Sequence, residues 1–347
     1  MIEIKIGDRL IGLNNTPFII AEMSGNHNQS IDRAKDIIKA AAESGAHAIK
    51  LQTYTPDTMT ISGAFTINDV NSLWDGRELY DLYKEAYTPW EWHAELFEYA
   101  KSLNLIAFST PFDETAVDFL EGLGVFLYKV ASFENTDWPL LRKVAKTGKP
   151  VIMSIGAATV AQIGDAVEVL QSSGCKELIL LKCTSTYPSS PNNTNLATIP
   201  HLRQMFDCLV GLSDHTMGIG VSVASVALGA CVIEKHFTLN REDGGVDSTF
   251  SMEPDEMKML VNEANKAFQA LGSIQYGVQE SEKKSLIFKR SVYVVKDIKK
   301  GDKFTSENIR VIRPGDGLPP KYYEIILGKR AGKNYNAGIP LTWENLL

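Results

Sequence analysis

The sequence contains few cysteines and no apolar run of membrane-spanning length. Its four cysteines, at positions 175, 183, 208 and 231, lie in or beside short apolar runs and show no CxxC spacing. This usage is typical of reduced core residues in a cytosolic protein and argues against a disulfide framework. No apolar run approaches the ~20 residues of a membrane span, and the N-terminus lacks a basic-then-apolar signal pattern. We therefore expect a cytoplasmic protein that does not bind a membrane.

Positive charge is also in short supply. The chain carries 35 Lys and Arg residues against 42 Asp and Glu residues, a formal net charge of −7. This balance argues against nucleic acid as a partner. Any anionic ligand must therefore be held by cations at particular positions.

The chain does contain a repeated pattern, in which a compact apolar segment ends in polar residues and a helical segment follows. Eight such strands with intervening helices, over about 220 residues, predict a (β/α)₈ TIM barrel. A doubly wound open sheet is the alternative, but no GxGxxG motif follows the first strand. The predicted strands are residues 18–24, 48–52, 106–110, 127–132, 150–156, 177–185, 209–214 and 232–238, and the predicted helices include 31–44, 89–102, 114–123, 138–147, 160–172, 217–230 and 254–271.

Segments outside this pattern complete the predicted architecture. Residues 2–13 alternate about a Gly-Asp turn and predict an N-terminal β-hairpin. The insertion at 53–88, with Trp74 and four tyrosines (54, 80, 83 and 87), is too long for a simple βα loop and is predicted to cover or wall the site. The polar segment 272–284 is predicted to link a barrel domain, 1–271, to a small β-rich domain, 285–347, with strands at 290–295 and 308–313.

Two histidines follow neighbouring strands of the predicted barrel. His215 and His236 each come after a short apolar run, and the small, apolar residues 217–230 between them predict a helix. Strand, helix and strand form a parallel crossover unit, which brings both strand ends to one edge of the sheet. Two imidazoles there can share a divalent ion, and the polar residues that crowd both strand ends favour this over two ordinary hydrogen-bonded histidines. We predict a metal site.

Alternation along the strands predicts which side chains face the mouth of the barrel, where such barrels place their chemistry. Two lysines among hydroxyl groups predict a cradle for phosphate or carboxylate, because each supplies hydrogen-bond donors. Glu22 is either a catalytic carboxylate or an ion-pair partner of one of these lysines. The predicted mouth residues are Glu22, Ser24, Lys50, Gln52, Thr110, Lys129, Ser132, Ser154, Ser185, Ser213, His215, Glu234, His236 and, just past the eighth strand, Asp247.

A metal ion, a phosphate cradle, a carboxylate base and a tyrosine-lined lid suit the addition of a phosphorylated carbon nucleophile to a metal-polarised carbonyl. They equally suit a metal-dependent aldolase or a phosphosugar hydrolase. The spacing of the residues does not separate these reactions.

Several motifs resemble the sialic acid synthase family. They are AEMSGNHNQS at 21–30, IKLQT at 49–53, STPF at 109–112, YKVAS at 128–132, GLSDHT at 211–216 and EKHFT at 234–238. The motifs LQTYTPDTMT at 51–60, YTPWEW at 87–92 and IRPGDGLPP at 312–320 resemble its pseudaminic acid synthase branch. The resemblance runs almost end to end, and the last 60 or so residues resemble the antifreeze-like (SAF) domain of these enzymes.

The resemblance implies condensation of phosphoenolpyruvate with an N-acetylated amino sugar and release of phosphate. For this branch it implies 2,4-diacetamido-2,4,6-trideoxy-β-L-altrose as acceptor and pseudaminic acid as product; N-acetylneuraminate or legionaminate synthesis is the alternative within the family. It also implies a homodimer in which Arg313 of the SAF domain reaches the sugar in the other subunit's barrel.

The family's site residues correspond to particular positions of this chain. The phosphoenolpyruvate contacts fall on Lys50, Thr110, Lys129, Ser132, Ser154 and Ser213, with Ser185 assigned beside them, although the sialic acid enzymes have asparagine at that point. The glutamate base falls on Glu22, the Mn²⁺, Co²⁺ or Mg²⁺ ligands on His215 and His236, and the sugar contacts on Gln52, Tyr187, Asp247 and Arg313.

Overall fold

The computed structural model describes residues 2–70 and 72–345. The chain divides into two compact units, Met1–Gly272 and Ser273–Leu347. Each unit is described by itself.

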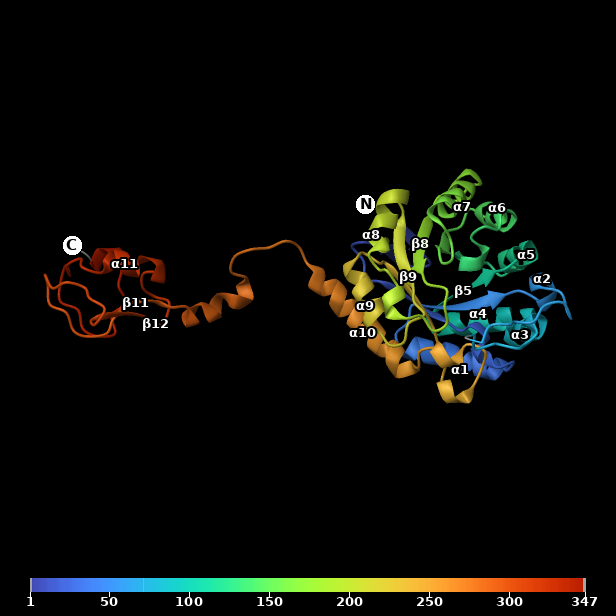
Figure 1. Ribbon diagram of the computed structural model, residues 1–347, viewed down its shortest axis with the longest axis horizontal. Coiled ribbons are helices and arrows are strands. Elements are labelled where there is room, and N and C mark those ends of the chain that lie inside the picture. The colour runs from blue at the N-terminus through green and yellow to red at the C-terminus, as the bar shows by residue number, and fades with distance from the viewer. Residues whose placement is uncertain (1, 71, 346–347) are drawn as a thin grey trace. The chain divides into compact units, whose positions relative to one another are not determined.

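The first unit is a closed barrel of eight parallel strands with helices around them, as Figure 1 shows. The predicted TIM barrel is therefore confirmed. The strands follow one another around the barrel in the order β10-β3-β4-β5-β6-β7-β8-β9. They are β3 (Phe18–Glu22), β4 (Ala48–Thr53), β5 (Ile106–Pro111), β6 (Tyr128–Val130), β7 (Val151–Ser154), β8 (Leu178–Cys183), β9 (Leu209–Ser213) and β10 (Val232–His236). The longer helices are α1 (Ile31–Glu43), α4 (His93–Ser102), α5 (Glu114–Gly122), α6 (Trp138–Ala145), α7 (Val160–Ser172), α8 (Thr198–Phe206), α9 (Gly220–Ala227) and α10 (Pro254–Leu271).

Local sequence signals explain why these elements form where they do. The strands are apolar along most of their length because both faces of a barrel strand are covered, one by the interior and one by the helices. Helix α1 begins at Ser30, whose side chain accepts a hydrogen bond from the Arg33 N–H, and it buries Ala34, Ile37 and Ile38 on one face. The polar side chains near the strand ends are therefore the exceptions in an apolar frame.

The N-terminal hairpin closes one end of the barrel. Strands β1 (Glu3–Ile6) and β2 (Arg9–Gly12) pair antiparallel, which confirms the predicted hairpin. Ile4, Ile6 and Ile11 are buried in one apolar cluster with Phe18, the first residue of β3. The N-terminal end of the barrel is thereby filled, so the accessible mouth lies at the C-terminal ends of the strands.

Several predicted boundaries were wrong. The predicted strands ran on through Ser24, Ser132, Gly156 and Thr238, whereas the structure ends each strand earlier. Ser24 and Ser132 lie in short 3₁₀ helices, Gly156 lies in a turn, and Thr238 lies in irregular backbone. Helix α8 was not predicted, and helix α9 is shorter than predicted. The insertion at 53–88 forms two short helices, α2 (Pro56–Met59) and α3 (Leu79–Ala86).

The second unit is small and carries its own core. Strands β11 (Ser291–Val294) and β12 (Ile309–Ile312) pair antiparallel at the predicted positions, and a single short α-helix, α11 (Tyr323–Ile326), follows them in the described part of this unit. Val292, Phe304, Ile326 and Leu341 belong to its apolar cluster. A 3₁₀ helix, Glu280–Phe288, overlaps the segment that was predicted to be a linker. Within the described residues, no helix combines the length and apolarity needed to cross a membrane.

Two buried histidines predict a loss of stability in acid. Burial, above all, lowers the pKa of His27 and of His93 to about 4 from an ordinary 6.5. Below pH 6.5 the unfolded chain binds protons that the folded barrel does not, so the unfolding free energy falls as the pH falls toward 4. Each histidine should remove about 2 kcal/mol by pH 5.

Urea unfolding at pH 7.5 and pH 5 measures this loss. His93→Gln keeps a polar group toward the Thr53 hydroxyl, 2.8 Å from the His93 Nε2, but cannot become a cation at pH 5. The variant should therefore lose less stability than the wild type between the two pH values. An equal loss of unfolding free energy in both proteins would contradict the lowered pKa of His93 as a cause of acid instability.

Candidate active site

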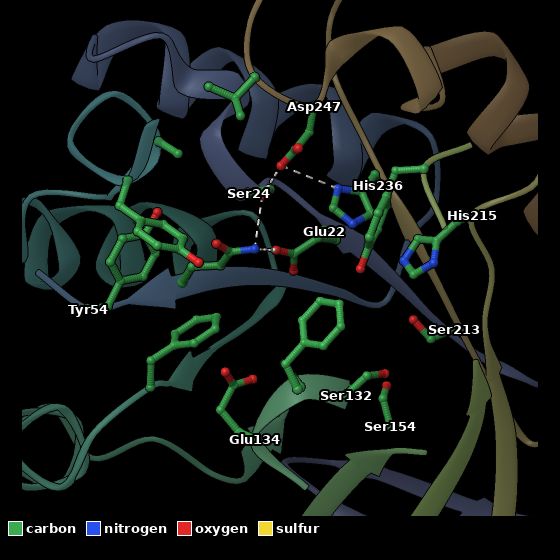
Figure 2. A pocket seen from close by; sticks show the side chains of 18 of the residues that line it. Glu22, Ser24, Tyr54, Ser132, Glu134, Ser154, Ser213, His215, His236 and Asp247 are labelled. Atoms are coloured by element: carbon green, nitrogen blue, oxygen red, sulfur yellow. Dashed lines mark hydrogen bonds and ion pairs between the residues drawn. The ribbon is translucent and has the colours of Figure 1, made fainter. Parts of the chain in front are cut away.

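The barrel mouth holds a cavity of about 330 Å³. Its floor is built from side chains at the ends of β3, β4, β6, β7, β9 and β10, and Figure 2 shows several of them converging on one space. The lining includes eleven of the fourteen residues to which the family resemblance assigned a role: Glu22, Lys50, Gln52, Lys129, Ser132, Ser154, Tyr187, Ser213, His215, His236 and Asp247.

Two buried lysines form the cationic floor of this cavity. The Nζ of Lys50 lies 3.0 Å from the Thr110 hydroxyl, and the Nζ of Lys129 lies 2.7 Å from the Ser154 hydroxyl. Both ammonium groups also lie 3.9 Å from the Glu234 Oε1. Burial lowers the pKa of Lys129, an effect that the Glu234 carboxylate only partly opposes. An anionic ligand would favour the charged form of this lysine, so the floor suits a phosphate or a carboxylate.

Glu22 stands beside this floor with a perturbed carboxyl group. Its Oε2 lies 2.6 Å from the Lys50 Nζ, and only 1% of the residue is exposed. Burial raises the pKa of Glu22 to about 7, with Lys50 opposing the shift and Glu234 adding to it. The two readings of Glu22 left open by the sequence are therefore compatible, because an ion-paired carboxyl with a pKa near 7 can still exchange a proton.

The two predicted histidines lie side by side. Their ring centroids are 5.3 Å apart, and Figure 2 shows both rings at one side of the cavity. Burial, aided by the nearby positive charges, holds the pKa of His236 well below its usual value, so this imidazole is neutral. Its Nδ1 is buried without a hydrogen-bond partner among the residues described. The neutral His236 ring therefore has a nitrogen lone pair that is available to a metal ion.

The surroundings of His215 also fit a metal ion. Its Nδ1 lies 3.0 Å from the Thr184 carbonyl, which can only accept, so this nitrogen carries the hydrogen and the lone pair of Nε2 is left available for a metal ion. Burial lowers the pKa of His215, but its contacts with Cys183 and the Thr184 carbonyl outweigh burial and raise it. A position that stabilises a proton also favours a metal cation.

The chain provides an incomplete set of metal ligands. In the described residues, no group of three or more His, Cys, Asp and Glu side chains is arranged to hold a metal ion. Two histidines leave the other coordination positions to water and substrate, as an open catalytic site requires.

A polar chain joins Glu22 to Asp247 across the mouth. The Gln52 amide donates to the Glu22 Oε1 at 3.0 Å and to the Ser24 hydroxyl at 2.9 Å, and the Ser24 hydroxyl donates to the Asp247 Oδ2. The same Asp247 oxygen lies 3.9 Å from the His236 Nδ1. Gln52 and Asp247 are thereby held next to the histidine pair, where a polar substrate could contact both.

The opposite wall of the cavity is apolar, and the insertion supplies most of it. The Trp74 indole donates to the Val246 carbonyl at 3.1 Å, which joins the insertion to the loop that carries Asp247. The prediction that this segment walls the site is confirmed, but Tyr80 and Tyr87 do not line the cavity. The residues of the insertion that do so are Tyr54, Met59, Ile67, Trp74, Leu79, Leu82, Tyr83 and Ala86.

Three predicted site residues do not line the cavity. Thr110 lies behind Lys50, and Ser185 lies beside Cys183, with its Oγ 3.7 Å from the Cys183 Sγ. Arg313 belongs to the second unit.

Conversely, Glu134 was missed. It lines the cavity, its Oε2 has no hydrogen-bond partner in the described part of the chain, and burial raises its pKa to about 7. It follows β6 in a 3₁₀ turn, where strand alternation gives no signal.

Comparisons with known proteins agree with this geometry. Residues 37–276 match the model of the NeuB family, and residues 289–347 match that of the SAF domain. The chain is 44% identical to a pseudaminic acid synthase of Campylobacter jejuni, over 92% of this chain and 94% of the relative. It is 43% identical to a pseudaminic acid synthase of Helicobacter pylori, over 95% of this chain and 98% of that relative.

A solved structure gives the same result for the fold. The N-acetylneuraminic acid (sialic acid) synthetase of Leptospira borgpetersenii, crystallised with citrate, superposes with a TM-score of 0.74 at 33% identity. The match covers 82% of this chain and 95% of that one. On the barrel, the site and these matches together, the chain belongs to the NeuB family and ends in a SAF domain.

Proposed function

We propose that this chain is a pseudaminic acid synthase. It condenses phosphoenolpyruvate with 2,4-diacetamido-2,4,6-trideoxy-β-L-altrose and water, and it releases pseudaminic acid and phosphate. The observation that carries the proposal is one cavity that combines a two-lysine floor, a carboxyl group with a pKa of about 7 and a histidine pair. The relatives in Campylobacter and Helicobacter with this activity support the choice of substrate.

The cationic floor binds phosphoenolpyruvate. Lys50 and Lys129 offer ammonium groups, and Ser132, Ser154 and Ser213 line the same cavity with hydroxyl groups. Thr110 and Ser185, which lie just outside the lining, hold their neighbours in place. These donors match the phosphate and carboxylate oxygens of the substrate, since both are acceptors only.

His215 and His236 hold the metal ion. When bound there, Mn²⁺, Co²⁺ or Mg²⁺ supplies Lewis-acid polarisation of the open-chain sugar aldehyde. Gln52, Tyr187 and Asp247 orient the sugar, because they border the histidine pair; the Tyr187 ring centroid is 4.5 Å from that of His215.

Glu22 acts as the general base for the attacking water. C3 of phosphoenolpyruvate forms the new bond to the aldehyde carbon, whose oxygen takes up a proton, and C2 is left with cationic character. Glu22 accepts a proton from water as the water oxygen adds to C2. The bond between C2 and the phosphate oxygen then breaks, the C2 hydroxyl gives its proton to the departing phosphate, and C2 becomes a ketone. The proton that Glu22 took from water balances the one taken up by the aldehyde oxygen. A pKa of about 7 suits this exchange near neutral pH.

The apolar wall predicts which sugar is preferred. A doubly acetamidated, 6-deoxy sugar presents methyl groups where N-acetylmannosamine presents hydroxyls, and Met59, Ile67 and Leu79 supply matching apolar surface. An apolar pocket discriminates weakly against an added hydroxyl, so we expect kcat/KM to favour the 6-deoxy sugar by about 10- to 100-fold.

Product mass analysis with phosphoenolpyruvate and a panel of sugars tests both the reaction and the preference. Ile67→Ser should narrow the preference, whereas Ile61→Ser, at a residue of the same insertion that is 68% exposed, should not. Equal kcat/KM for both sugars would contradict this preference. Cleavage of a phosphosugar without phosphoenolpyruvate would indicate an aldolase instead.

The SAF domain completes the site of a second subunit in a homodimer. In this arrangement residues 272–284 lead from the barrel domain, 1–271, to the SAF domain, 285–347. The apolar side chains of Ile274 and Tyr276 are more than nine-tenths exposed in the single chain, at 92% and 93%. Contact with a second copy would bury them, which supports the dimer.

A further inference from the structure

A buried ion pair lies directly behind the two histidines. The Lys235 Nζ is 3.0 Å from the Asp214 Oδ2, and the two side chains are 1% and 0% exposed. Asp214 precedes His215, and Lys235 precedes His236, so each member of the pair is the chain neighbour of a histidine. Neither side chain lines the cavity, and the mechanism above uses neither.

The pair is the centre of a larger set of hydrogen bonds. The Lys235 ammonium also donates to the Thr216 carbonyl at 2.6 Å and to the Gly218 carbonyl at 3.0 Å. The Asp214 carboxylate accepts from the Thr216 N–H at 2.9 Å and from the Ser222 hydroxyl at 2.6 Å. The segment on both sides of His215 is therefore tied to a side chain of β10, the strand that ends in His236.

Stability of the fold does not explain such a pair. Removing two charges from water costs several kcal/mol for each ion, and replacing a buried pair by neutral groups of similar size is often neutral or stabilising. The pair does, however, restrict how far the loop after β9 can move from the end of β10. Two ligands of an incomplete metal site need this restriction, because their separation sets the affinity for the ion.

We propose that Asp214 and Lys235 are positioning residues, which hold residues 214–218 against β10 and so fix the separation at which His215 and His236 share a divalent ion. This inference rests on the metal site of the proposed function.

The test compares Mn²⁺ affinity with stability in the wild type and four variants. Asp214→Asn and Lys235→Met are made singly and together, and Glu121→Gln with Lys149→Met removes an ion pair of 2.5 Å between α5 and the residues before β7 as a matched control. Mn²⁺ binding is titrated by calorimetry on chelator-treated protein, and urea unfolding is measured in the presence of chelator.

Each single variant leaves an uncompensated buried charge, so we expect it to lose both stability and Mn²⁺ affinity. The double variant should regain much of the stability, yet bind Mn²⁺ about 10- to 100-fold more weakly than the wild type, because the bonds to Thr216 and Gly218 stay lost. The control should bind Mn²⁺ as the wild type does. Wild-type affinity in the double variant would overturn the inference and leave the metal site intact.

Two further results are decisive. Should the double variant fail to fold, Ser222→Ala, which deletes one hydrogen bond and keeps both charges, replaces it. An unchanged Mn²⁺ affinity in Ser222→Ala would then overturn the inference. A wild-type protein that binds none of Mn²⁺, Co²⁺ or Mg²⁺ would overturn the metal site and this inference together.

Discussion

His215→Ala and His236→Ala should each lower kcat at least about 10³-fold while the barrel stays folded. The expected size follows from the Lewis-acid role of the ion, which is worth several kcal/mol of transition-state stabilisation. The fold should survive because, in residues 2–70 and 72–345, the two histidines are not part of a closed set of four ligands, the kind on which structural zinc sites depend. Circular dichroism and thermal unfolding should therefore resemble those of the wild type.

Metal removal provides a second test of the catalytic role of the metal ion. Chelator treatment should abolish phosphate release from phosphoenolpyruvate, and added Mn²⁺ should restore it in the wild type but not in the two histidine variants. His201→Ala, at an exposed histidine on α8, is the matched control and should keep wild-type activity. Full activity in metal-stripped enzyme would refute the role of the ion.

Much of the barrel mouth could be predicted from the sequence because strand alternation is a local rule. Lys50 and Gln52 are two residues apart on one strand, and both side chains line the cavity. The same rule placed Ser213 and His215, and Glu234 and His236, on the inner side. These predictions succeeded because the inward direction repeats every second residue wherever the backbone remains extended.

The rule fails where the strand ends. Ser24 has a positive φ of 47° and Ser132 begins a 3₁₀ helix, so neither continues the alternation, although both still reach the cavity. Ser185 lies two residues beyond the end of β8, and its side chain does not line the cavity. Glu134 was missed for the same reason, since its position depends on a turn that no periodic pattern marks.

Helix α8 was not among the predicted helices, and it contains a proline near its start. Pro200 is the third residue of the helix, and a proline in the first turn removes an N–H group that has no partner within the helix. The orientation of the tyrosines in the insertion could not be predicted from the sequence. Aromatic residues marked the insertion, but only the fold shows that Tyr54 and Tyr83 turn toward the cavity while Tyr80 is hydrogen-bonded to Asp57 at the surface.

The remaining large effect concerns Arg313, and we expect Arg313→Ala to raise KM for the sugar about 10- to 100-fold, a change that corresponds to one lost charged hydrogen bond. Arg313 is exposed, and no hydrogen bond or ion pair joins its side chain to the rest of the described chain. The loop that follows is anchored, because the Ser291 hydroxyl donates to the Pro314 carbonyl at 2.8 Å and accepts from the Gly317 N–H at 2.9 Å. An anchored loop can present a free guanidinium to a ligand held elsewhere. The KM for phosphoenolpyruvate should change little, because the cationic floor binds that substrate.

Mixing two defective chains tests whether Arg313 acts on the partner's site. The connecting segment is long enough, since seven extended residues and a nine-residue 3₁₀ helix together span about 40 Å. If Arg313→Ala and Glu22→Ala chains are refolded together, half of the dimers are mixed, and each mixed dimer has one site with Glu22 from one chain and Arg313 from the other. Activity at sugar concentrations well below KM should then recover to about a quarter of the wild-type value. A cis arrangement predicts no such recovery, because each site would keep the defect of its own chain. Verified mixed dimers without activity would therefore show that the arginine serves its own barrel or no barrel at all.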